Sequence, residues 1–373
     1  MKKILFNKLF FDVIKFFLLI SVSLALIIWV VQAVNFLDYI SEDGHGIKTY
    51  FLITALNLPK IFSRIIPFCI FIATFYIINK YETKNELLIF WNIGINKIRF
   101  INNLILLSIF FLLVQIILNA LLVPSSQNLA RDYIRSSNID FFPNLVKEKK
   151  FIDTVSNLTI YVEKKDRDGN FKHVYLKDKL NENKSQIIYA KKGKIENIDN
   201  KNFLILNDGK FIDVDEKKIT TFTFKKTEFD LSKYTTKTTT FPKVQEIKTK
   251  FLLQCLSKLN LDENFYKADE TLVCDKNVET SIKEEIFKRI FKPLFIPVII
   301  LIACIMVLFN KDYFNYSRIQ YFIFTFGVFV IIISEILARW VESNNSFVIF
   351  LMIPIIIFIL NYFFILQKLR FKS

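Results

Sequence analysis

The chain has 373 residues and a formal net charge of +15, and 53% of its residues are hydrophobic, including 42 phenylalanines. This composition is atypical of a soluble protein, and many lysines and arginines flank apolar runs, as expected on the cytoplasmic side of membrane spans. A basic charge also suits nucleic-acid binding, but the sequence carries no recognisable nucleic-acid-binding module, so no nucleic-acid partner is expected.

Six apolar runs are candidates to cross a membrane as helices, which takes about 20 mostly apolar residues each. Three lie before the polar middle of the chain and three lie after it. The first run is too long for a signal peptide, and no small-residue cleavage site follows it. The predicted spans are 16–37, 50–79, 100–123, 293–310, 319–334 and 343–367.

The chain therefore divides into three predicted parts. Residues 1–123 hold the first three spans, residues 124–284 form a soluble domain with a helical and loop-like C-terminal part, and residues 285–373 hold the last three spans. Basic residues concentrate at the N-terminus, in the loops after the second and fourth spans, and in the C-terminal tail. This bias predicts that both termini are cytoplasmic and that the soluble domain faces outward, into the periplasm of a cell with two membranes.

The polar middle begins with short stretches in which apolar and polar residues alternate, the pattern of strands with one buried face. Asp168-Gly169 and Asp208-Gly209 are expected to form tight hairpin turns. Six such strands predict an all-β sandwich, jellyroll or barrel, whose interior is either an ordinary closed core or a half-open sheet that holds an acyl chain. The predicted strands are 151–155, 158–165, 171–178, 185–193, 202–209 and 219–229.

After the strands, the sequence predicts a helix over 244–260 and a loop over 262–277. Cys255 and Cys274 lie in this polar region, where they are either bonded to each other, if the region is outside the cytoplasm, or two separate thiols. The other two cysteines lie in apolar runs, where a thiol is usually a small packing residue: Cys69 and Cys304.

A stretch of mixed charge, KYETKNELLIFWNIGINK at 80–97, lies between the second and third spans. Thr83 and Glu86 match a capping box, in which the threonine side chain accepts from the backbone N–H of the glutamate and the carboxylate reaches back. Gly94 suits the left-handed conformation that ends a helix. The stretch predicts a short capped helix over 83–94 on the inner face of the membrane.

The apolar residues of this helix are spaced to share one side: Leu87, Phe90 and Trp91. Two roles for Glu86 remain open from the residues alone. Either it serves only as a cap, or it binds beside an aromatic anchor in a groove of a cytoplasmic ATPase.

The sequence holds no recognisable catalytic or energy-converting centre. It has no GxxxxGK[ST] phosphate loop, no zinc-ligand spacing and no nucleophile beside a base. Its two histidines, His45 and His173, are predicted to be solvated surface residues. We therefore expect this chain to have no catalytic residue and to bind no metal and no cofactor.

Five further features of the sequence belong together: LPKIFSRIIP at 58–67, ELLIFWNIG at 86–94, IYVEKK at 160–165, FTFKKTEFDL at 222–231, and Glu285, Arg289 and Pro293 at the entry to the fourth span. In these motifs the chain resembles the LptF/LptG permeases of the bacterial lipopolysaccharide exporter. The stretch KYETKN at 80–85 is closer to the LptF branch than to LptG. The segment that contains Cys255 and Cys274 has no counterpart in this resemblance.

The resemblance implies a membrane α-helical fold of six transmembrane helices with an inserted periplasmic jellyroll-like domain. It implies a permease subunit of an ABC transporter in the inner membrane, which extracts lipopolysaccharide and passes it to a periplasmic bridge. Its implied partners are an LptG-like second subunit, a dimer of an LptB-like ATPase that uses ATP and magnesium, and an LptC-like bridge protein. A membrane-anchored periplasmic scaffold without transport activity is the alternative.

Residue roles follow from the same resemblance. The predicted contact with the ATPase is made by Glu86, Leu87, Phe90, Trp91 and Gly94. Glu335, Arg339 and Glu342, near the outer end of the fifth span, are predicted gate or interface charges.

Lys60 and Arg64 interrupt the second span and share one helix face. Charges next to hydrocarbon are costly unless partnered. In the light of the resemblance, we expect them to contact a lipid A phosphate. The alternatives are a pair with an acid of the partner subunit, or extension to the outer surface of the membrane.

Overall fold

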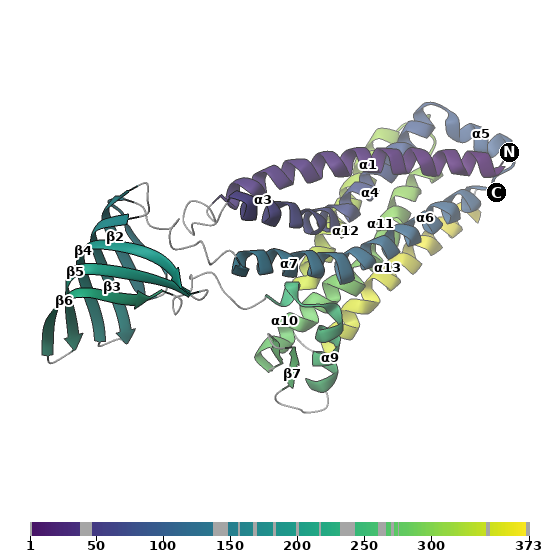
Figure 1. Ribbon diagram of the computed structural model, residues 1–373. Helices are drawn as coiled ribbons and strands as arrows, with labels where there is room; N and C mark the ends of the chain where they lie inside the picture. Colours follow the sequence, from purple (N-terminus) through teal and green to yellow (C-terminus); the bar gives the residue numbers. More distant parts are fainter. Residues whose placement is uncertain are drawn as a thin grey trace. The chain divides into compact units, whose positions relative to one another are not determined.

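The computed structural model describes residues 2–37, 47–136, 148–155, 157–166, 170–181, 184–198, 201–215, 218–231, 243–259, 266–269, 272–274, 276–340 and 344–370. The chain forms two compact units (Figure 1). The helical unit comprises residues 1–30, 57–128 and 243–373, and the sheet unit comprises residues 31–56 and 129–242.

Six helical segments of the described residues are long and apolar enough to cross a membrane, which confirms the predicted arrangement of three spans, an insertion and three spans. They are Lys2–Asn35, Ile47–Thr83, Lys97–Ile134, Val278–Leu308, Tyr316–Arg339 and Met352–Arg370. The principal helices within them are α1 (Lys2–Asn35), α3 (Ile47–Leu56), α4 (Leu58–Thr83), α6 (Lys97–Ile117), α11 (Phe295–Cys304), α12 (Tyr316–Arg339) and α13 (Asn344–Arg370).

Helix α11 lies at the centre of the helical unit, in contact with α4, α6, α12 and α13. Its sequence, FIPVIILIAC, is apolar on every side, and a helix of that kind is buried because it has no polar face to expose. The apolar window of this fourth span is 67% buried, whereas that of α13 is only 11% buried. The core is therefore organised around the fourth span, and the sixth presents most of its surface outward.

Gly327 allows α12 to approach α4 closely. A Cβ atom added at Gly327 would lie 2.1 Å from the ring of Phe71. That ring is fully buried and stacks on Phe324, with the two centroids 5.8 Å apart. The missing side chain is thus a steric requirement of this helix pair, as is common where membrane helices pack through small residues.

We expect Gly327→Ala to destabilise the protein by about 1–3 kcal/mol, because the added methyl group must displace the Phe71 ring. Thermal unfolding in detergent, followed by near-ultraviolet circular dichroism, measures the effect. Thr325→Ala, on the exposed side of the same helix, is the matched control and should leave the midpoint unchanged. Equal midpoints for the two variants would contradict the packing argument.

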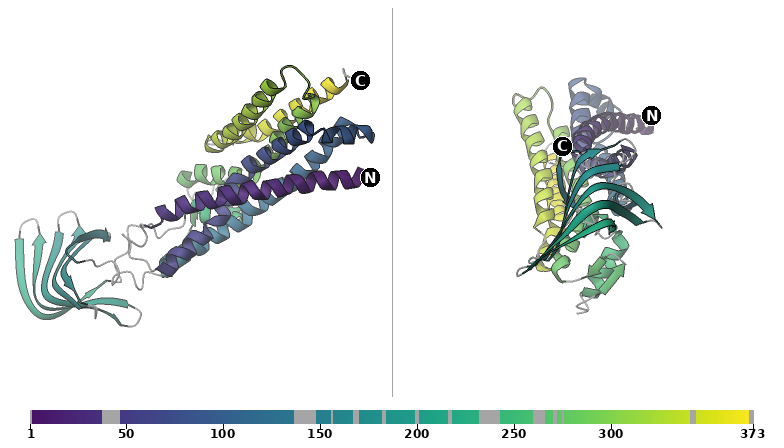
Figure 2. Two further views of the ribbon diagram at one scale, coloured as in Figure 1. Left: turned by 90° about the horizontal axis from the view of Figure 1, so that it is seen from above. Right: turned by 60° about the vertical axis from the view of Figure 1, so that its left-hand side comes forward.

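The sheet unit contains the predicted strand domain as a six-stranded antiparallel sheet, which confirms an inserted β domain. Each strand pairs with its neighbours in sequence, so the sheet is a meander, and its strands curve strongly (Figure 2). The strands are β1 (Phe151–Val155), β2 (Leu158–Lys165), β3 (Asn170–Asn181), β4 (Lys184–Ile198), β5 (Lys201–Asp215) and β6 (Lys218–Asp230).

One face of this sheet forms a closed apolar core. Ile160, Val162, Leu176 and Leu206 are among its fully buried side chains. The cavity within this core measures only about 10 Å³, which is about the space of a single water molecule. The described side chains of this core therefore leave no internal space for an acyl chain, while the sheet itself is open, with β1 and β6 as its edges. Binding of an acyl chain by the sheet stays a prediction.

The prediction of a hairpin turn at Asp208-Gly209 is wrong, because β5 continues through this pair to Asp215. Asp208 has a positive φ of 53° inside the strand, and a Cβ atom at Gly209 would lie 2.4 Å from the ring of Phe224. The pair marks a bend in a long strand and a close approach of a neighbouring side chain. The other expected turn, Asp168-Gly169, lies outside the described residues.

His173 has the same left-handed conformation in β3, with φ 53°. Its imidazole is exposed, as predicted, and its Nδ1 lies 2.7 Å from a carboxylate oxygen of Glu163 on the neighbouring strand. His45 lies outside the described residues.

Residues 243–284 belong to the helical unit, whereas the sequence assigned them to the soluble domain. The apolar side of α9 packs on α10, with Leu252, Cys255, Ile282 and Ile286 buried between them. Two short strands replace the predicted loop. The elements are η3 (Val244–Glu246), α9 (Thr249–Leu259), β7 (Tyr266–Asp269), β8 (Leu272–Cys274) and α10 (Lys276–Ile286).

Candidate functional site

A polar cavity of about 400 Å³ lies among the helices of the helical unit. Its walls come from α4, from the end of α6, from the entry to α11 and from the end of α12. Basic side chains dominate the lining. The six bases are Lys60, Arg64, Lys288, Arg289, Lys292 and Arg339, and the two acids are Glu285 and Glu335.

Lys60 and Arg64 lie one turn apart on α4, and both face this cavity, as their spacing predicts. The Lys60 ammonium donates to Oε1 of Gln127 at 3.4 Å. The Gln127 amide in turn donates to Oδ1 of Asn57 at 3.0 Å. These partners are uncharged, so they orient the ammonium without neutralising it.

Two π-helical turns face one another at the cavity: η1 (Leu118–Leu122) and η4 (Phe287–Phe291). Each is followed by a proline, which lacks the N–H that an α-helix requires: Pro124 and Pro293. The Asn119 side chain of η1 donates to the carbonyl of Lys288 in η4, with an N–O distance of 3.4 Å. Single π turns inside α-helices often occur at functional sites.

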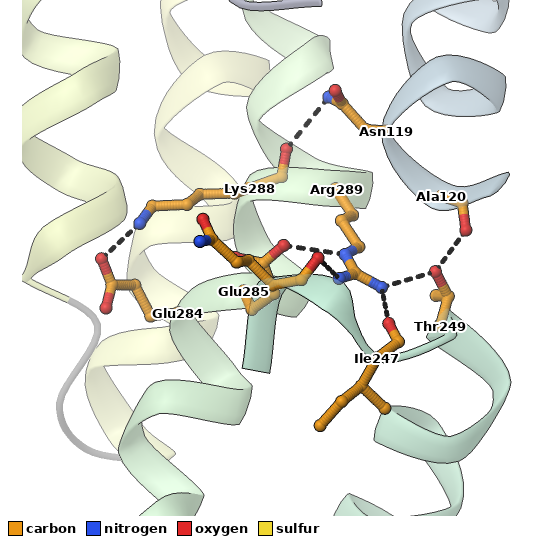
Figure 3. A network of polar contacts seen from close by, with 9 residues as sticks. Asn119, Ala120, Ile247, Thr249, Glu284, Glu285, Lys288 and Arg289 are labelled. Atoms are coloured by element: carbon orange, nitrogen blue, oxygen red, sulfur yellow. Dashed lines mark hydrogen bonds and ion pairs between the residues drawn. The ribbon is translucent and has the colours of Figure 1, made fainter. Parts of the chain in front are cut away.

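Arg289 joins this pair of turns to the segment that returns from the sheet unit (Figure 3). Its buried guanidinium donates to Oε1 of Glu285 at 2.9 Å, and to the carbonyls of Ile247 at 2.8 Å and Gln245 at 3.0 Å. It also donates to the Thr249 hydroxyl at 2.9 Å. Glu285 and Arg289, which belong to the motif at the fourth span, thus fix the segment 245–249 at the start of the last part of the helical unit.

The Thr249 hydroxyl donates in turn to the carbonyl of Ala120, at 2.5 Å (Figure 3). Ala120 belongs to the π turn η1, and Pro124, four residues later, has no N–H to donate to it. The hydroxyl therefore gives a carbonyl of this turn a donor from a distant part of the chain. Sequence reasoning missed this role of Thr249, because nothing in a local pattern connects residues so far apart.

We expect Arg289→Met to destabilise the protein by about 3 kcal/mol or more, because it leaves Glu285 and two backbone carbonyls buried without their donor. Thermal unfolding in detergent measures the loss. Lys288→Met, at the half-buried neighbouring position, is the control and should have a much smaller effect. Similar midpoints for the two variants would show that the Arg289 contacts contribute little.

Helix α12 supplies the remaining charges of the cavity. Glu335 pairs with Lys292 at the entry to α11, and Arg339 lines the cavity one turn further on. The third predicted gate charge, Glu342, lies outside the described residues. The pair shows that α12 is tied to the fourth span by charge; a gating role stays a prediction.

The cavity also contains a buried acceptor without a donor. Gln115 donates through Nε2 to the carbonyl of Ser63 at 2.6 Å, while its Oε1 has no hydrogen-bond partner among the described residues. Buried polar atoms are rarely left unsatisfied in folded proteins. This oxygen is therefore a place where a ligand or a water molecule would donate a hydrogen bond.

Sequence reasoning named six of the charged residues of the cavity but missed Lys288 and Lys292. Lys288 and Lys292 are spaced by four residues, the same spacing that singled out Lys60 and Arg64. The signal was present, but these two lie in a polar stretch before the apolar run. In the sequence they resemble ordinary charges that flank a membrane span. In the structure, both line the cavity at or next to the π turn.

The predicted capping box of the inner-face helix is wrong. Helix α4 runs on to Thr83, whose hydroxyl donates to the carbonyl of Lys80, and the short helix α5 (Glu86–Asn92) begins after a left-handed Asn85. Glu86 is therefore the first residue of α5 rather than its third. Because α4 continues to Thr83, this threonine is the last residue of one helix and cannot be the N-cap of the next.

The predicted stop at Gly94 is present. Its φ is 73°, its N–H donates to the carbonyl of Trp91 at 2.9 Å, and the next N–H, of Ile95, donates to the carbonyl of Phe90 at 3.0 Å. These two bonds form a Schellman motif.

The apolar side of α5 packs on the chain's own core. Leu87 and Phe90 are buried, and the Phe90 ring contacts Phe100 edge-on, with centroids 5.2 Å apart. The opposite side carries Leu88 and Ile89, each 49% exposed. A contact with an ATPase stays a prediction, and these two residues are the apolar side chains that α5 exposes for it.

Glu86 pairs with Lys8 of α1, with an N–O distance of 3.2 Å. Lys2 donates to the carbonyl of Gly94 at 3.3 Å, and Phe6 packs on Phe90. The first turns of α1 therefore fasten α5 to the helical unit.

Cys255 is buried and disulfide-bonded. The side chain of Cys274 lies outside the described residues, so their pairing stays a prediction. Cys69 and Cys304 are buried free thiols, in keeping with packing roles.

Fold and cavity together define a class, a multi-pass helical membrane protein with an inserted antiparallel sheet and a basic cavity among its spans. Over residues 8–368 the sequence matches the family described as lipopolysaccharide export system permease LptF/LptG, and the chain belongs to this family. The match does not distinguish LptF from LptG, so the LptF branch stays a prediction.

Over 207 residues, or 55% of its length, the chain is 21% identical to the uncharacterized protein RP871 of Rickettsia prowazekii (strain Madrid E). The chain spans 57% of the length of this curated relative.

Proposed function

We propose that the chain is a permease subunit of an ABC transporter that extracts lipopolysaccharide from the inner membrane and passes it to a periplasmic bridge. The observation that carries the proposal is the cavity of six bases and two acids within the apolar helical unit. Ionisable side chains are costly inside a membrane, so a basic cluster there marks a binding site for an anion. Lipid A, which bears phosphates and acyl chains, has the matching chemistry.

Three of the cavity's bases are available to such an anion. Lys288, Arg289 and Lys292 each pair with a glutamate. In the described part of the chain, the other three cavity bases form no ion pair: Lys60, Arg64 and Arg339. We propose that these three bind a lipid A phosphate and that Oε1 of Gln115 accepts a hydrogen bond from the ligand.

The proposed orientation places both termini in the cytoplasm, the sheet unit in the periplasm and the cavity towards the outer leaflet. In support, Lys60 and Arg64 lie at the start of α4, whose other end leads into α5. The first turns of α1 and the last turns of α13 lie at the same end of the helical unit as α5 (Figure 1).

We expect the double variant Lys60→Gln/Arg64→Gln to bind lipopolysaccharide about tenfold more weakly, because charge-assisted hydrogen bonds to a phosphate are lost. Thermophoresis of the detergent-purified complex with labelled lipopolysaccharide measures the affinity. Arg318→Gln, an exposed base of α12 that does not line the cavity, is the control. Unchanged affinity in a double variant that melts normally would rule out the phosphate role.

We propose that the exposed side of α5, formed by Leu88, Ile89 and Asn92, docks on an LptB-like ATPase that uses ATP and magnesium. Leu87 and Phe90 anchor the helix in the core of the helical unit. A partner that binds the exposed side would therefore meet a helix that is fixed in place. A dimer of that ATPase, an LptG-like second subunit and an LptC-like bridge protein complete the proposed assembly.

Ile89→Glu should abolish recovery of the ATPase with the purified permease, because it places a carboxylate in the apolar contact. Lys84→Glu adds the same group at an exposed position just before α5 and should retain the ATPase. Quantitative mass spectrometry of the purified complexes is the readout. If wild-type protein brings down no ATPase, the membrane-anchored scaffold replaces the transport proposal.

A further inference from the structure

A groove of about 610 Å³ lies on the surface of the sheet unit. It crosses the large sheet, because strands β2 to β6 all contribute to its lining. This volume is typical of sites that bind small molecules. The groove shares no residue with the basic cavity of the helical unit.

Three tyrosines place the groove on the face of the sheet opposite the apolar core. Side chains of a strand point alternately to its two faces, and Tyr161 lies between Ile160 and Val162, which are buried in the core. The other two, Tyr175 and Tyr189, likewise lie between buried core residues, on β3 and β4. The three rings therefore stand on the outer face, and all of them line the groove.

The backbone register aligns these tyrosines in one row across the sheet. Tyr161 pairs with Tyr175, which pairs with Tyr189. Phe151 of β1 extends the row at one end, and Lys210 of β5 extends it at the other. Neighbouring rings are in contact, with centroids 5.0 Å apart for Tyr175 and Tyr189. Tyr189 is nevertheless 49% exposed, so the row offers aromatic surface to a ligand.

Polar groups without partners surround the aromatic row. The three tyrosine hydroxyls, the ammonium groups of Lys191 and Lys210 and the carboxylate of Asp208 form no hydrogen bond or ion pair within the described part of the chain. The remaining titratable side chain of the lining, His173, is paired with Glu163. With two lysines against one aspartate, the unpaired groups carry a net positive charge.

A bend in the sheet forms one wall of the groove. His173 of β3 and Asp208 of β5 line it, and both have a left-handed φ of 53°. On β3 the buried residues Phe171 and Val174 are three positions apart across His173, whereas a regular strand buries residues an even number apart. The strand thus exchanges its two faces at this point. The backbone conformation, rather than the side-chain rotamers alone, sets the shape of this wall.

We propose that this groove binds an acidic oligosaccharide. Its pyranose rings lie against the tyrosine rings, and its carboxylate or phosphate groups bind the ammonium groups of Lys191 and Lys210. The face of an aromatic ring carries the negative part of the ring quadrupole, and the C–H groups on the face of a pyranose carry a small positive charge, so the two surfaces attract. Ammonium groups bind anionic oxygens through charge-assisted hydrogen bonds.

The unpaired polar groups favour a saccharide over an acyl chain. The hydroxyls of a saccharide donate to the Asp208 carboxylate and exchange hydrogen bonds with the tyrosine hydroxyls. An acyl chain can do neither, and it would leave these groups unsatisfied wherever it excludes water. The inference concerns the outer face of the sheet and does not depend on the proposed export activity.

Binding to the full-length protein in detergent, measured by thermophoresis, tests the proposal. Two acidic saccharides are compared: tetragalacturonate and the core oligosaccharide released from lipopolysaccharide by mild acid. Maltotetraose has pyranose rings without charge, and tetraglutamate has carboxylates without rings. We expect at least one acidic saccharide to bind about tenfold more tightly than both of these. Equally tight binding of maltotetraose or of tetraglutamate would overturn the proposal, because charge or ring contact would then contribute nothing.

The two acidic saccharides also distinguish the source of the ligand. Tighter binding of the core oligosaccharide assigns the groove to the saccharide part of the proposed cargo. Tighter binding of tetragalacturonate assigns it to a soluble polysaccharide. Binding of neither overturns the proposal.

Variants locate the binding. Tyr189→Ala and the double variant Lys191→Gln/Lys210→Gln should each weaken it about tenfold, because ring contact or charge-assisted hydrogen bonds are lost. The control Lys164→Gln/Lys172→Gln removes two exposed lysines that pair on β2 and β3 and do not line the groove, so it should retain the affinity. An equal loss in the control would attribute the binding to the general charge of the sheet and overturn the proposal.

Discussion

The hydrogen bond from the Thr249 hydroxyl to the π turn η1 is the interaction on which the polar structure of the helical unit depends. Pro124 cannot donate to the Ala120 carbonyl, and in a membrane a carbonyl without a donor costs several kcal/mol. The Thr249 hydroxyl supplies the donor and is itself held by Arg289. One side chain far away in the sequence thereby completes a transmembrane helix, and the π turns on either side of this contact open a polar space among apolar helices.

This arrangement separates two kinds of cation in one cavity. Arg289 is buried and its donors are taken by a glutamate, a hydroxyl and backbone carbonyls, so its role is structural. Lys60, Arg64 and Arg339 line the same cavity without an ion pair among the described residues, so their charge is available to a ligand. Burial and hydrogen-bond partners agree on this division, because Arg289 is buried whereas Arg64 and Arg339 are exposed.

At the opposite end of the helices, α5 has one side packed against the core and one side exposed. Leu87 and Phe90 belong to the core, and Glu86 and Gly94 are fastened to the first turns of α1. Any displacement imposed on the exposed side of α5 would therefore act directly on the first membrane span.

The sequence by itself determined the six spans and the six strands of the large sheet, because apolar length and period-two alternation are local properties that burial must satisfy. It also placed the helix stop at Gly94. Tertiary structure decided the rest. Thr83 became part of α4 instead of a cap, Asp208-Gly209 became a bend inside a strand, and residues 243–284 joined the helices. Local patterns fix periodicity and capping potential, but only long-range packing decides which side of an element is covered and which distant donor reaches a given carbonyl.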